Sequence, residues 1–71
     1  MMNENFEIEN AVAYEAVENL VLGIPDEADP IGVVHLTVMD LVQLLVEDGG
    51  YSPEDVQSLV SIAIGRTKVM N

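Results

Sequence analysis

The chain has 71 residues, 49% of them hydrophobic, no cysteine, and 13 acidic residues against two basic ones, for a formal net charge of −11. A chain this short has room for one domain with one small core, and without cysteine it has neither disulfides nor thiolate metal sites. Because residues 1–65 contain no Lys or Arg, the composition excludes conventional binding to nucleic acid or to anionic membranes, which both need cationic side chains.

Two segments bear on the compartment of the protein. Residues 1–9 contain acids but no Lys or Arg, so they lack the basic start of a secretory signal. The longest apolar stretch, residues 31–46, is interrupted by Gly, His, Thr, Asp and Gln and is short for a membrane span. We therefore expect a soluble, cytoplasmic protein with no membrane partner.

The first helix is predicted over residues 6–22. Asn3 or Asn5 is the expected N-cap, and Gly23 is expected to end the helix. At 100° per residue, the apolar side chains gather on one side of this helix and the acidic side chains on the other. The acidic residues are Glu4, Glu7, Glu15 and Glu18. The pattern predicts an amphipathic helix with an acidic face, which the loop acids Asp26, Glu27 and Asp29 extend.

The second helix is predicted over residues 30–47. Asp29 is the expected N-cap because proline, favoured at the first helical position, follows it, and the pair Gly49-Gly50 is expected to end the helix. Apolar residues surround nearly the whole helix, which is typical of a central or shared helix. Its β-branched residues lower the helix propensity, so a strand at residues 31–38 is the competing prediction.

The third helix is predicted over residues 53–64. Ser52 is a suitable N-cap, followed by proline and two acids, and Gly65 is expected to end the helix. The two cations, Arg66 and Lys68, would then lie just beyond the negative end of the helix. Its buried face is predicted to consist of Val56, Leu59, Val60, Ala63 and Ile64, with Ile62 outside that face.

These elements predict an all-α fold in which residues 1–71 form a single three-helix domain. Two other helices cannot cover both apolar faces of the central helix, so an exposed apolar patch is expected, of the kind that usually marks an interface. The residues left over are Leu36, Met39, Val46 and Ile62. Twofold symmetry is the commonest way to close such a patch, so we expect a helical homodimer that self-associates through them.

Three features of the sequence could carry chemistry, but each has a plainer interpretation. Residues 37–65 have the outline of a helix-turn-helix, but the second helix offers no cation to DNA. Asp26, Glu27 and Asp29 do not have the spacing of a calcium loop and suit a solvated loop with a helix cap better. His35, the only histidine, has no evident catalytic partner. We therefore predict no enzyme activity, metal or cofactor.

The chain is similar to acyl carrier proteins in size, acidity and helical class. In that family the carrier group is attached to a Ser in an Asp-Ser-Leu motif at the start of the second helix. Here the second helix begins Asp29-Pro30-Ile31, without a serine. The resemblance therefore does not extend to the carrier function.

The acidic face is the strongest functional signal in the sequence. Soluble surfaces usually intersperse both signs of charge, whereas a field of one sign repels itself and favours a partner of the opposite sign. We expect a non-enzymatic interaction module that binds a basic protein surface, such as a small inhibitor or nucleic-acid mimic of the kind phages and mobile elements encode. The alternative is a structural subunit or assembly adaptor that uses its apolar helix faces, with acidity serving only solubility.

Overall fold

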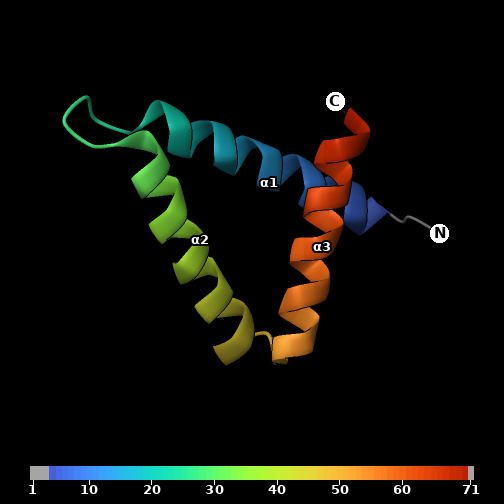
Figure 1. The fold of residues 1–71 in the computed structure, drawn as a ribbon. Coiled ribbons are helices and arrows are strands. Elements are labelled where there is room, and N and C mark those ends of the chain that lie inside the picture. The colour runs from blue at the N-terminus through green and yellow to red at the C-terminus, as the bar shows by residue number, and fades with distance from the viewer. Residues whose placement is uncertain (1–3, 71) are drawn as a thin grey trace. The chain divides into compact units, whose positions relative to one another are not determined.

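The computed structural model describes residues 4–70, and within that range it is all-helical, with three helices and no strand (Figure 1). The helices are α1 (Glu4–Leu22), α2 (Pro30–Glu47) and α3 (Pro53–Met70). The competing prediction of a strand at residues 31–38 is wrong, because those residues form the first half of α2.

The two predicted N-caps of α2 and α3 are confirmed. Asp29 accepts a hydrogen bond from the Gly32 backbone N–H through Oδ2 at 3.0 Å. At the start of α3, Ser52 and Asp55 form a reciprocal capping box: the Asp55 N–H donates to Ser52 Oγ at 3.1 Å, and the Ser52 N–H donates to Asp55 Oδ2 at 2.9 Å. Each bond satisfies a backbone donor that the first helical turn leaves free.

The turn between α2 and α3 is built on glycine. Gly50 has a φ of +73°, a left-handed conformation that side chains with a Cβ rarely adopt. The Tyr51 N–H donates to the Leu45 carbonyl oxygen at 3.1 Å, a bond across the glycine pair that satisfies one of the carbonyl groups left free at the end of α2. The sequence prediction that α2 ends at the glycine pair is thus correct.

Two helix boundaries differ from the prediction. The first helix begins at Glu4, so Asn5 lies inside it and is not its cap, while Asn3 lies outside the described residues. The third helix continues through Gly65 to Met70 and carries Lys68 in its last turn. Gly65 costs a helix only about 1 kcal/mol relative to Ala, and its backbone has no positive φ, so it does not end α3.

Contacts divide the chain into two compact units, Met1–Val34 and His35–Asn71. The first contains α1, the loop and the first turn of α2; the second contains the rest of α2, the glycine turn and α3. The single domain predicted over residues 1–71 stays a prediction.

No side chain among residues 5–68 is buried. The predicted buried face of α3 is therefore wrong for the single chain: Val56 is half-buried, while Leu59 and Val60 remain 42% and 46% exposed. Apolar residues surround most of the circumference of α2. The contacts within each unit therefore leave part of its apolar surface uncovered.

By length and composition alone, α2 is apolar and long enough to cross a membrane. Its 18 residues correspond to about 27 Å, close to the hydrocarbon thickness of about 30 Å. The core helix of a soluble protein meets the same two criteria, so this is weak evidence for a span. Solubility and cytoplasmic location remain predictions of the sequence.

Candidate interaction surfaces

Charge is distributed unequally between the two units. The unit Met1–Val34 contains eight of the 13 acids and no Lys or Arg, whereas His35–Asn71 contains five acids and both cations. The first unit therefore has no basic side chain of its own with which to neutralise any carboxylate.

The acidic row of α1 is the most ordered part of this charge. Glu7, Glu15 and Glu18 are exposed, and together with position 4 they fall within an arc of about 80° on the helix. From position 4 to position 18 the row extends about 21 Å along the axis. The Glu4 side chain lies outside the described residues, so its placement here is that of its backbone.

The loop acids predicted to extend this row have different roles. Asp26 and Glu27 are exposed, and no hydrogen bond within the described residues engages their carboxylates. Asp29 is also exposed, but its Oδ2 caps α2. Asp29 therefore contributes negative charge while serving primarily as a structural residue.

An apolar groove of about 360 Å³ lies within the second unit. From α2 it is lined by Val38 and Val42, and from α3 by Leu59, Val60, Ala63, Ile64 and Thr67. No charged side chain lines it. It marks the side on which α2 and α3 face each other.

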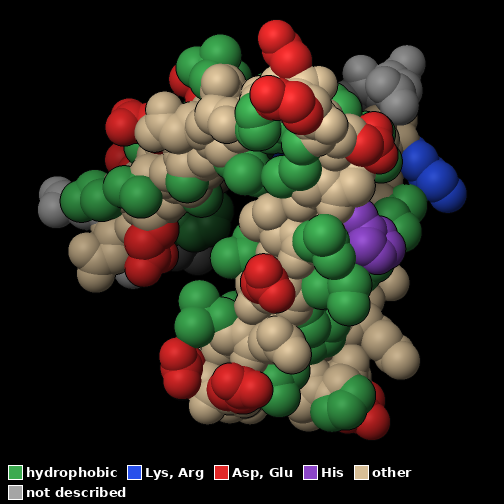
Figure 2. All heavy atoms as spheres, turned by 90° about the vertical axis from the view of Figure 1, so that its left-hand side faces the viewer, with side chains coloured by type: hydrophobic (Ala, Val, Ile, Leu, Met, Phe, Trp, Pro, Cys, Tyr) green, Lys and Arg blue, Asp and Glu red, His purple; other side chains and the backbone are tan. Residues whose placement is uncertain are grey.

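The apolar residues predicted to mediate self-association are all exposed. Leu36, Met39 and Val46 of α2 are 60%, 54% and 45% exposed, and Ile62 of α3 is 63% exposed. At 100° per residue, Leu36 lies about 120° from Val42, one of the two α2 residues that line the groove, whereas Met39 and Val46 lie about 60° and 40° from it and so border the groove side. Figure 2 shows such hydrophobic side chains at the surface, with acidic side chains between them.

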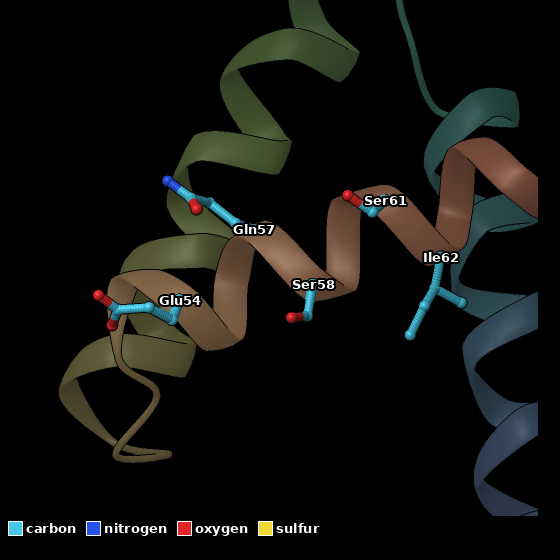
Figure 3. A pocket seen from close by; sticks show the side chains of 5 residues that line it. All are labelled: Glu54, Gln57, Ser58, Ser61 and Ile62. Carbon is cyan, nitrogen blue, oxygen red and sulfur yellow. The ribbon is translucent and has the colours of Figure 1, made fainter.

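Two shallow depressions lie along single helices. One, of about 520 Å³, runs along α1 and is lined by Tyr14, Val17, Glu18, Val21 and Leu22. The other, of about 530 Å³, runs along α3 and is lined by Glu54, Gln57, Ser58, Ser61 and Ile62 (Figure 3). The hydroxyl groups of the second belong to Ser58 and Ser61, and its one charged lining residue is Glu54.

The described residues contain no group of three or more His, Cys, Asp or Glu side chains placed to hold a metal ion. His35 is exposed on α2. The sequence analysis missed one relationship: because α3 continues past Gly65, Arg66 lies on the same helix as Asp55 and Ile62. The signal was present in their spacing, but the expected helix end concealed it.

Comparison of the chain with family models, with curated proteins and with solved structures found no match.

Proposed function

We propose that the protein is a non-enzymatic, acidic interaction module that binds the basic surface of a nucleic-acid-binding protein. The observation that carries this proposal is the unit Met1–Val34, in which eight acids have no basic counterpart. A surface of one sign raises the local concentration of oppositely charged partners and accelerates their association. The exposed row on α1 is the expected contact.

The dimensions of the α1 row are compatible with imitation of a phosphate backbone. The glutamates form two pairs, at positions 4 and 7 and at positions 15 and 18, about 4.5 Å apart within each pair and about 12 Å apart between the pairs along the helix axis, while phosphates of one DNA strand rise about 3.4 Å each. A cleft that neutralises phosphates with Lys and Arg would accept the carboxylates in their place. Small inhibitors encoded by phages and mobile elements are the class of protein that this activity fits.

Self-association is the second part of the proposal. Leu36, Met39, Val46 and Ile62 remain 45–63% exposed in the single chain, and exposed apolar faces of this kind usually mark interfaces. We propose that α2 and α3 supply a homodimer interface and that α1 supplies the acidic surface. In this proposal the unit Met1–Val34 binds the partner, and the unit His35–Asn71 mediates self-association.

A structural subunit or assembly adaptor is the second candidate. The observation that favours it is the exposure of Leu36, Met39 and Val46 on α2, since another protein would cover these side chains as readily as a second copy. In this candidate the acids only keep the molecule soluble. The two candidates differ in salt dependence, because contacts between charges weaken with ionic strength and apolar contacts do not.

The test is capture of partners from a lysate by the immobilised protein at low and at high salt. The charge variant combines Glu7→Gln, Glu15→Gln and Glu18→Gln. The matched control removes three charges from the other unit through Glu47→Gln, Asp48→Asn and Glu54→Gln. We expect basic nucleic-acid-binding proteins to be captured at low salt by the wild type and the control, and lost from the α1 variant. Equal capture by the wild type, the α1 variant and the control would contradict the assignment of α1 as the contact surface.

A further inference from the structure

Four residues on one face of α3 have a self-complementary order. Asp55, Leu59, Ile62 and Arg66 follow one another at intervals of four, three and four residues, the spacing of a coiled-coil seam. Within an α-helix these positions fall in an arc of about 60°. We call this set the α3 seam. It has an acid at one end, a base at the other and two aliphatic side chains between them.

The four side chains are available for a contact. Asp55 and Arg66 are exposed, and Leu59 and Ile62 are 42% and 63% exposed. Figure 3 shows Ile62 and Gln57 projecting in different directions from α3, with Ile62 at the edge of the polar depression that both residues line. Leu59 also lines the groove that faces α2. The α3 seam therefore lies beside that groove on the surface of α3.

The two charged ends of the seam cannot satisfy each other within one chain. Asp55 and Arg66 are eleven residues apart, or about 16 Å along the helix. Arg66 makes no ion pair with any described residue. Asp55 uses Oδ2 to accept the Ser52 N–H, which holds its side chain in place and leaves Oδ1 without a partner among the described residues.

We propose that the occupant of the α3 seam is the α3 seam of a second copy, in antiparallel orientation about a twofold axis. The axis passes between Leu59 and Ile62, so that each Leu59 meets the partner's Ile62 and each Asp55 meets the partner's Arg66. Positions equally distant from the axis lie at the same height, so all four contacts form together. This inference rests on the self-association proposed above and assigns its centre.

Charge selects both the orientation and the partner. A parallel pair would place Asp55 beside Asp55 and Arg66 beside Arg66, and like charges in contact are repelled. A shift of one heptad would separate the acid from the base. The charged side chains of α1 are all acidic, since no residue before position 66 is Lys or Arg. Helix α1 would therefore repel Asp55. Antiparallel packing also brings the positive end of each helix dipole near the negative end of the other.

The test exchanges the charges between two variants, Asp55→Arg and Arg66→Asp. Each variant alone places like charges at both ends of the seam, so we expect its self-association to weaken by at least about tenfold relative to wild type. Mixed in equal amounts, the two variants restore both opposite-charge contacts. The expected result is a heterodimer, observed by native mass spectrometry and by sedimentation, at concentrations where neither variant dimerises alone.

Loss of the capping box in Asp55→Arg is controlled separately. Asp55→Asn keeps an oxygen that accepts the Ser52 N–H but removes the charge, and circular dichroism of each variant reports whether the helices form. Recovery of the dimer in the mixture also shows that both chains fold.

Three results would overturn the inference. One is a wild-type dimer that both charge variants retain; this refutes the seam but leaves the proposed self-association standing. Another is two helical variants that stay monomeric when mixed. The third is a wild-type chain that is monomeric at tens of micromolar, which refutes the proposed self-association as well.

Discussion

Replacement of Ile62 by glutamate tests the apolar centre of the proposed dimer. Ile62 is 63% exposed in the single chain, and complete burial of an isoleucine side chain stabilises by about 1.5–3 kcal/mol. Covering the exposed part is then worth roughly 1–2 kcal/mol per chain, or roughly 2–4 kcal/mol for the two copies in a dimer. We expect Ile62→Glu to raise the dimer dissociation constant roughly 30- to 800-fold. Repulsion between the two new carboxylates near the axis adds to this effect.

The assay is sedimentation equilibrium at several concentrations in about 0.15 M salt, where the screening length is about 8 Å. The matched control is Gln57→Glu, which adds the same charge at a position that projects in a different direction from α3 (Figure 3). The control is expected to keep the wild-type dissociation constant. Equal weakening by both substitutions would show that added charge, and not loss of apolar contact, controls association. No change in either variant would remove Ile62 from the interface.

Three further predictions concern the glycines, α2 and salt. Gly65→Ala should raise the free energy of unfolding by about 0.5–1 kcal/mol, since a Cβ there meets nothing within 4 Å. Gly50→Ala should lower the free energy of unfolding by a similar amount, because the φ of Gly50 is +73°. Chemical denaturation measures both effects. Met39→Glu should weaken self-association in sedimentation as Ile62→Glu does, whereas an unchanged dimer would assign that face of α2 to another protein. Added sodium chloride should raise the melting temperature by screening repulsion among the 13 acids; a fall would mean that attractive ion pairs outweigh that repulsion.

The local signals in the sequence were sufficient to place α2 and the start of α3. Asp29 and Ser52 each precede a proline and cap their helices as expected, because capping depends only on residues within one turn. The end of α3 was not predictable in the same way. A glycine raises the free energy of a helix without forbidding it, and Gly65 remains helical up to the end at Met70.

The sequence predicted which residues share a helix face, but it did not predict which of these faces would be covered by other residues. The acidic row and the exposed positions of Leu36, Met39, Val46 and Ile62 follow from the helical period alone. Which apolar face is covered depends on tertiary contacts that a period does not encode, and the expected buried face of α3 proved exposed for that reason. The α3 seam depends on Arg66 being helical, so it became visible only once the true helix end was known.

The central claim, that the acidic unit occupies a nucleic-acid-binding surface, is tested most directly by competition. A nucleic-acid-binding protein captured at low salt is bound to a fluorescent oligonucleotide, and the anisotropy is followed as this protein is added. The proposal predicts that wild type and the control with Glu47→Gln, Asp48→Asn and Glu54→Gln displace the oligonucleotide, while the variant with Glu7→Gln, Glu15→Gln and Glu18→Gln does not. An oligonucleotide that stays bound while the protein associates elsewhere would contradict the proposal and favour an assembly adaptor.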